Sequence, residues 1–97
     1  MRVITRKALH LFALSNGQAT DALNERYLKT TTADWHSFSD IKQTFNSVDY
    51  VGNDRYVFNI KGNQYRIVAM ILFRIHMVYI RFVGTHAEDD KIDASTI

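Results

Sequence analysis

Hydrophobic and polar positions alternate most regularly in the second half of the chain. Two runs rich in β-branched and aromatic residues, 56–60 and 64–73, flank Gly62-Asn63. Such a dipeptide between two strand-like runs predicts a hairpin with a two-residue turn. The turn sets the cross-strand partners: Ile60 with Tyr65, Asn59 with Arg66 and Phe58 with Ile67.

In this register the predicted hairpin has one apolar face and one mixed face. The apolar face carries Tyr56, Phe58, Ile60, Tyr65, Ile67, Ala69, Ile71 and Phe73. The mixed face carries Val57, Asn59, Lys61, Gln64, Arg66, Val68, Met70 and Leu72. In a third strand Val78, Ile80 and Phe82 alternate with Tyr79, Arg81 and Val83. A slip of one residue would invert every face, so the apolar alternation supports the register.

The first half of the chain has helical spacing instead. A short strand is expected at 2–4, and Thr5 is the expected N-cap of a helix that Asn16-Gly17 ends. Thr20 is the expected cap of a second helix, which the threonines at 30–32 end, and Ser39 is the expected cap of a third helix at 40–45. The pattern predicts one α+β domain over residues 1–97: an antiparallel β-sheet meander with N-terminal helices packed on one face.

Charge is unevenly distributed along the chain. The formal net charge is +2, but residues 1–86 carry +5 and residues 87–97 carry −3. No Asp or Glu occurs from Arg55 to Ala87, a span that contains five basic residues. A strand-forming segment with charges of one sign indicates a polyanion partner.

Several functional classes have little support in the composition. The chain has no Cys, and its four His are far apart in the sequence, so no metal site is expected. The apolar runs are too short for a membrane span, and no signal-peptide core is present at the N-terminus. We therefore expect a cytoplasmic protein without a membrane partner.

Four residues are the first candidates for chemistry. Arg66 and Arg81 are expected on the mixed face, where guanidinium groups can bind phosphate. His86 and Glu88 follow the last strand and could share proton transfer. The alternatives are a solvated sheet face for the arginines and a simple cap for the turn after the strand. Tyr79, also on the mixed face, is a candidate for stacking on a base.

Three segments together carry a resemblance to a known family. VITRKAL at the start, IKGNQYRIVAM in the hairpin and VYIRFVGTHAED at the end resemble the HigB toxins of the RelE/ParE superfamily. The resemblance spans nearly the whole chain and implies the toxin of a type II toxin–antitoxin system. Such toxins are ribosome-dependent mRNA endoribonucleases that need no metal or other cofactor. The partners implied are the ribosome, mRNA and a HigA-like helix-turn-helix antitoxin, with operator DNA bound only through the antitoxin.

With this resemblance, the expected site has two groups of residues. The catalytic candidates are Arg66, Arg81, His86, Glu88 and Asp89, and the RNA-binding candidates are Asn59, Lys61, Asn63 and Tyr79.

The chain departs from the family pattern at Asp89. Relatives commonly read THAEYD where this chain reads THAEDD at 85–90. An Asp there brings negative charge to an anion site, which is unfavourable unless Arg pairs with it. Because the position lies beyond the last strand, its replacement is expected to leave the core intact. Two alternatives stay open: a ParE-like toxin that binds a protein target, and a catalytically inactive RNA-binding variant.

Overall fold

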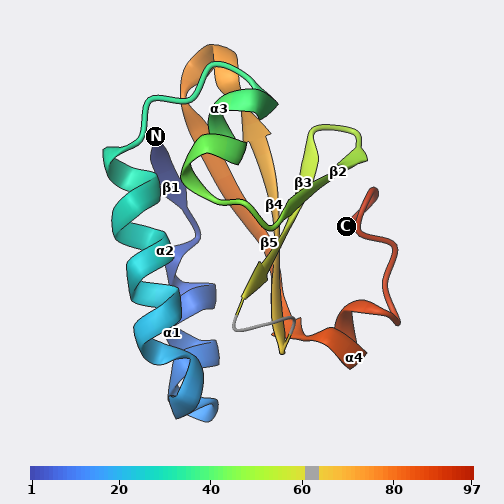
Figure 1. Ribbon diagram of the computed structural model, residues 1–97. Coiled ribbons are helices and arrows are strands. Elements are labelled where there is room, and N and C mark those ends of the chain that lie inside the picture. The colour runs from blue at the N-terminus through green and yellow to red at the C-terminus, as the bar shows by residue number, and fades with distance from the viewer. Residues whose placement is uncertain (61–63) are drawn as a thin grey trace.

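A five-stranded sheet with helices on one face forms the centre of the fold (Figure 1). The structure is a computed structural model that describes residues 1–60 and 64–97. The strands are β1 (Arg2–Ile4), β2 (Val48–Gly52), β3 (Arg55–Ile60), β4 (Tyr65–Leu72) and β5 (Met77–Thr85). The helices are α1 (Arg6–Ser15), α2 (Thr20–Thr32), α3 (Phe38–Thr44) and α4 (His86–Asp89), with 3-10 turns η1 (Gly17–Ala19) and η2 (Phe73–Ile75). The expected α+β class is confirmed.

The sheet has the order β1-β5-β4-β3-β2. The three predicted cross-strand pairs of the β3–β4 hairpin are confirmed, and β2 to β5 form an antiparallel meander. The meander is not the whole sheet, because β1 pairs in parallel with β5 and makes the sheet mixed. Two helices separate β1 from the rest of the sheet in sequence. The alternation within each strand therefore did not reveal that β1 pairs at the edge of the meander. The Gly62-Asn63 turn lies outside the described residues.

A β-bulge in β5 changes the predicted faces. Ala69 pairs with Ile80 and Val68 pairs with Phe82, so Arg81 is an extra residue between them. Beyond the bulge the alternation is shifted by one, and Val83 rather than Phe82 packs against the core under the helices. The expectation that Phe82 shares a face with Ile80 was therefore wrong.

The predicted helices are present, with small shifts in their ends. Thr5 precedes α1 in a left-handed conformation (φ 66°), and its hydroxyl bonds to the backbone of Ile80 instead of capping the helix. The threonines at 30–32 do end α2, and their hydroxyls bond back to carbonyls one turn earlier. The third helix begins at Phe38, two residues before the predicted start, after Ser37. Among the described residues, no helix has the length and apolar character needed to cross a bilayer.

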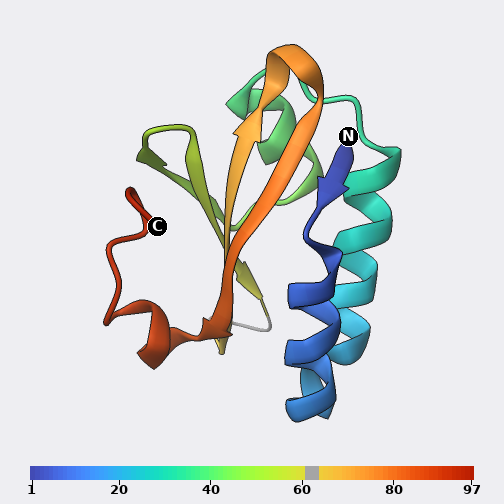
Figure 2. The ribbon, with the colours of Figure 1, turned by 180° about the vertical axis from the view of Figure 1, so that it is seen from behind.

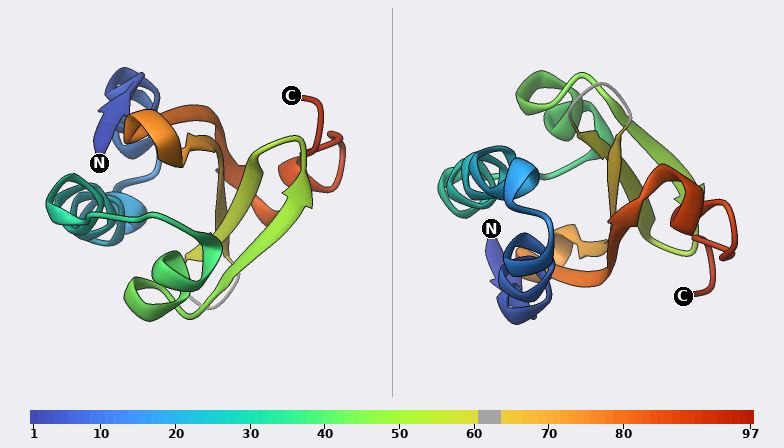
Figure 3. Two further views of the ribbon diagram at one scale, coloured as in Figure 1. Left: turned by 90° about the horizontal axis from the view of Figure 1, so that it is seen from above. Right: turned by 90° about the horizontal axis from the view of Figure 1, so that it is seen from below.

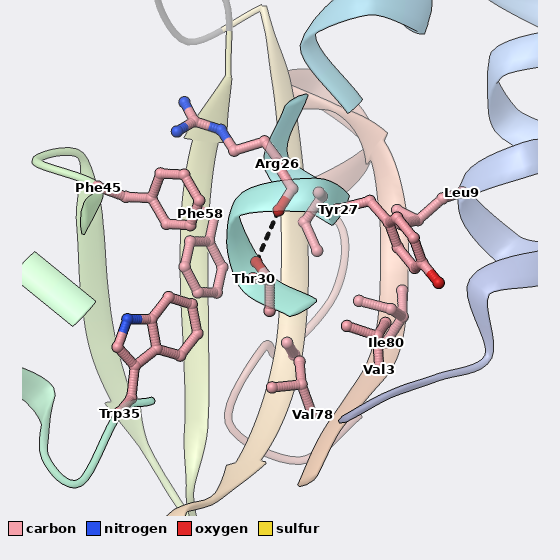
Figure 4. A pocket seen from close by; sticks show the side chains of 12 residues that line it. Val3, Leu9, Arg26, Tyr27, Thr30, Trp35, Phe45, Phe58, Val78 and Ile80 are labelled. Carbon is pink, nitrogen blue, oxygen red and sulfur yellow. Dashed lines mark hydrogen bonds between the residues drawn. The ribbon is translucent and has the colours of Figure 1, made fainter. Parts of the chain in front are cut away.

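The main core lies between the helices and one face of the sheet. Its largest fully buried side chains include Leu23, Ile41, Ile60 and Ile71. A largely apolar cavity of about 30 Å³ remains between α2 and the sheet (Figure 4). Thr30 borders it, and the hydroxyl of Thr30 donates to the backbone oxygen of Arg26 (2.7 Å). The cavity is thus a packing space inside the core.

The C-terminal segment runs along the other side of the sheet (Figures 2 and 3). Near its end, Asn53 Nδ2 donates to the carbonyl oxygen of Ser95 (2.9 Å). Val57 and Val68 point to this side by their register, yet they are 6% and 0% exposed. The mixed face is therefore partly covered, and its apolar positions do not face open solvent.

Candidate functional site

Arg66 lies near one end of the mixed face, between two neighbouring strands. It pairs with Asn59 on β3 and with Gly84 on β5. It has the same alternation as Val68, so its side chain points away from the helices. No side chain fits at Gly84, because an added Cβ would lie 2.5 Å from the ring of Phe82 and 3.2 Å from Glu88 Oε1.

A close ion pair joins Arg66 to the short helix after β5. Arg66 Nη1 donates to Asp89 Oδ2 over 2.6 Å. Asp89 is 7% exposed, so this carboxylate belongs to the protein interior. The expectation that a change at Asp89 would leave the core intact depended on its position beyond the last strand, but α4 folds back onto β4 and buries the side chain.

Three polar atoms around this pair lack a hydrogen-bond partner. Within residues 1–60 and 64–97, these buried atoms are Asn59 Oδ1, Arg66 Nε and Asp89 Oδ1. Buried polar atoms usually have a hydrogen-bond partner, so three unsatisfied atoms close together mark a site with unused donors and acceptors. Asn59 and Arg66 face each other across the hairpin, and both are among the predicted site residues.

A capping box fixes the start of α4. The Thr85 amide donates to Glu88 Oε1 (2.9 Å), and the Glu88 amide donates to Thr85 Oγ1 (3.2 Å). The hydrogen bonds from the Thr85 backbone and then from its side chain lower the pKa of Glu88. Glu88 is thus a carboxylate that caps the start of α4. The sequence had instead suggested a role in proton transfer.

His86 is the first residue of α4 and points to the same end of the sheet as Arg66. Its amide donates to the carbonyl of Gln64 (3.1 Å), the residue directly before β4. His86 Nε2 lies 3.3 Å from Asp90 Oδ2, and Arg66 Nη1 lies 3.8 Å from Asp90 Oδ1. The exposed carboxylate of Asp90 therefore sits between the imidazole and the guanidinium, and the sequence reasoning did not include it.

Arg81 lies on the same face but has a different neighbour. Arg81 Nε donates to the Ile97 carbonyl (3.3 Å), and Arg55 donates to the same oxygen from Nε (3.1 Å) and Nη2 (2.9 Å). Arg55 pairs with Met70, which shares the alternation of Arg66 on β4. Tyr79 pairs with Met70 as well, so it also belongs to this face. Arg81 is two to three residues, roughly 7–10 Å, along the strand from the level of Arg66.

The candidates thus divide into three sets. Asn59, Arg66, His86, Glu88 and Asp89 gather where β3, β4 and α4 meet. Arg81 and Tyr79 lie further along β5 on the same face. Lys61 and Asn63 lie outside the described residues. Asp90 and Arg55 are additions from the structure, and the only sequence signal for Arg55 was its membership of the acid-free basic span.

The comparisons with known proteins define the class. The family model described as HigB_toxin, RelE-like toxic component of a toxin–antitoxin system, matches residues 19–92. A RelE-like toxin is thus the class that this α+β fold and its basic sheet face represent. The chain belongs to the HigB toxin family.

Curated relatives agree over a shorter segment. The mRNA interferase toxin HigB of Escherichia coli K12 is 44% identical over 57 residues, which cover 56% of this chain and 54% of that protein. The mRNA interferase HigB of Shigella flexneri matches to the same extent. The match therefore spans about half the length of these relatives.

Proposed function

We propose that this chain is an endoribonuclease toxin that cleaves messenger RNA on the ribosome, and that its site lies around Arg66 and His86. One observation carries the proposal: the Asp90 carboxylate is held between a guanidinium and an imidazole. A carboxylate and the two charged oxygens of a phosphate both accept charge-assisted hydrogen bonds from such donors. Asp90 is 59% exposed at its side chain, so an incoming RNA phosphate can displace it at small cost.

The reaction requires only groups that this site has. The ribose 2′-oxygen attacks the adjacent phosphorus, the bond from phosphorus to the 5′-oxygen breaks, and a cyclic phosphate forms. One proton leaves the 2′-hydroxyl and one reaches the 5′-oxygen. His86 is the proposed proton-transfer group, and Arg66 and Arg81 stabilise the charge on the phosphate in the transition state. This chemistry proceeds without a metal.

The remaining residues have supporting roles in the proposal. Glu88 holds the turn that presents His86. Asn59, which lies opposite Arg66 in the hairpin, is a proposed RNA contact, and Tyr79 stacks on a base. Lys61 and Asn63 stay predicted RNA contacts. Asp89 restrains Arg66, which otherwise is free to bind phosphate.

Primer extension on an mRNA translated in vitro tests the proposal. The expected result is a set of cuts that depends on translation and weakens about 100-fold in Arg81→Gln, since one transition-state donor contributes roughly 3 kcal/mol. Arg74→Gln is the matched control, because Arg74 is exposed in η2 at the opposite end of β4. Gyrase inhibition without cuts would instead establish a ParE-like toxin.

A second candidate function has its own observation. The short, buried Arg66–Asp89 pair neutralises the arginine nearest the imidazole, which favours RNA binding without efficient cleavage. RNA binding by the unchanged protein, with cuts absent and no gyrase inhibition, would support this variant.

The proposed partner is a HigA-like helix-turn-helix antitoxin, which would connect the toxin to operator DNA. A basic face fits an acidic or shape-matched surface, and covering it or blocking ribosome entry would hold the toxin inactive. We expect co-elution in size-exclusion chromatography after co-expression with the neighbouring gene, and separate elution would count against this partner. Action on ribosomes implies a cytoplasmic location.

A further inference from the structure

Two histidines and an aspartate from distant parts of the chain meet at the end of the sheet opposite α4. Asp34 and His36 come from the loop between α2 and α3, and His76 from the turn between β4 and β5 (Figure 1). One potential ligand atom from each lies within 4.8 Å of the others. Their spacing in the sequence gave no hint of this cluster.

The distances fit coordination of one ion. Asp34 Oδ1 lies 3.2 Å from His76 Nδ1, and Asp34 Oδ2 lies 3.3 Å from His36 Nε2. Two ligand atoms bound to a tetrahedral Zn²⁺ at about 2.0–2.1 Å are roughly 3.3 Å apart. The two imidazole rings are themselves in contact, with centroids 5.4 Å apart. Small side-chain rotations can therefore place both ring nitrogens and one carboxylate oxygen around a common centre.

The backbone holds the three side chains in position. Trp35 is buried between Asp34 and His36, and its Nε1 donates to Thr44 Oγ1 (3.0 Å). In an extended segment, residues two apart point the same way, so burial of Trp35 turns both neighbours outward. The His36 amide is fixed as well, by donation to Asp40 Oδ2 (2.8 Å).

His76 is held in a conformation that few residue types adopt. Its φ of 55° lies in the left-handed region, where His is more common than most non-glycine residues. Its amide donates to Phe73 O (3.2 Å), and its carbonyl accepts from the Arg2 amide (2.8 Å). Hydrogen bonds thus anchor the backbones of His36 and His76, and the burial of Trp35 orients Asp34, before any ion binds.

We propose that Asp34, His36 and His76 form a binding site for a divalent transition ion, with Zn²⁺ as the best-fitting occupant. Neutral imidazole and carboxylate are typical ligands of Zn²⁺, and three protein ligands leave a position for water. The side chains are 74%, 65% and 45% exposed, so water and the ion reach them freely. The bound ion links the α2–α3 loop to the β4–β5 turn and stabilises this end of the fold, away from Arg66.

Calorimetric titration of ZnCl₂ into untagged, chelator-treated protein tests the site. We expect one Zn²⁺ per chain, and a rise in Tm of roughly 11–22 °C when free Zn²⁺ is at 100 times the dissociation constant. The double variant His36→Gln/His76→Asn should lose at least tenfold in affinity and most of the Tm rise. Asn is chosen at position 76 because it tolerates the left-handed conformation.

His10→Gln is the matched control, since His10 is exposed on α1 outside the cluster. It should bind Zn²⁺ as the parent does. The proposal is overturned if the parent binds no Zn²⁺, if the folded double variant binds as tightly as the parent, or if His86→Gln alone abolishes binding. The Tm of each variant in chelator shows that it is folded.

Discussion

Replacing Asp89 by Asn removes the negative charge beside Arg66 and keeps a side chain of nearly the same shape. In the parent, Asp89 Oδ2 accepts from Arg66 Nη1 over 2.6 Å, and the two side chains are 8% and 21% exposed. Removal of one partner from a fully buried pair costs about 3–5 kcal/mol. Asn keeps an acceptor for Arg66, so the loss reduces to the difference between a charged and a neutral hydrogen bond, about 1 kcal/mol. For a chain of this size that loss lowers Tm by about 4–8 °C.

The same change should increase RNA cleavage. A carboxylate about 5 Å from a phosphate opposes it by roughly 1–3 kcal/mol at effective dielectric constants of about 20–80. Because 1.36 kcal/mol corresponds to a factor of ten in rate, we expect an increase in the cleavage rate of about 5-fold to 150-fold. Asn also holds Arg66 less tightly than Asp does, so Arg66 can turn toward the phosphate more easily, which acts in the same direction.

Two measurements check this prediction together. Thermal denaturation gives the change in Tm, and single-turnover cleavage of a translated mRNA gives the change in rate. Asp21→Asn is the control for net charge, because Asp21 is exposed in the first turn of α2. The reasoning is refuted if Asp89→Asn is folded and cleaves no faster than the parent, or if Asp21→Asn increases cleavage equally.

Asp89→Tyr extends the same test to the residue that the family resemblance implies. Its aromatic ring can stack on a base, a contact of about 1–3 kcal/mol. A ring cannot occupy the buried Asp89 position without displacing its neighbours, so a larger drop in Tm accompanies the expected gain in cleavage. Cleavage at or below the rate of Asp89→Asn would show that the charge, and not the missing ring, limits this chain.

Three further predictions concern other parts of the molecule. Arg81→Gln should change the free energy of unfolding by only about 0.5 kcal/mol while it impairs cleavage, which urea denaturation beside the primer-extension assay can establish. Because the folded-state pKa of Glu88 is lowered, its cap stabilises the fold above the ordinary Glu pKa, and this stability is lost as pH falls through the lowered value. Between pH 7 and pH 3 the Tm of Glu88→Gln should therefore fall less steeply than that of the parent. Parallel Tm curves would contradict a stabilising cap. Val78→Ile extends into the core cavity and should stabilise the fold by about 0.5–1 kcal/mol, whereas Val48→Ile, buried away from that cavity, should not. Equal effects at the two valines would show that the cavity is not the cause.

Local sequence predicted β1, the β3–β4 hairpin with its register, β5 and the helices α1 to α3, but it predicted neither β2 nor α4. Alternation at 56–60 and 64–73 predicted the pairing of Asn59 with Arg66, because one register alone buries the apolar set. It also predicted that Arg66 would face away from the helices. These features depend on residues close together in the sequence, where period and turn chemistry are strong constraints.

Tertiary structure decided the features that combine distant residues. The bulge at Arg81 is a feature of the pairing of β5 with β4, and no local sequence pattern specifies it. The folding of α4 onto β4 buries Asp89 against Arg66 and changes the expected effect of that residue from a surface charge to an internal partner. The approach of His36 to His76 across 40 positions likewise depends on the packing of the α2–α3 loop against the β4–β5 turn. Sequence patterns describe one element at a time, and each of these contacts arises only when separate elements pack together.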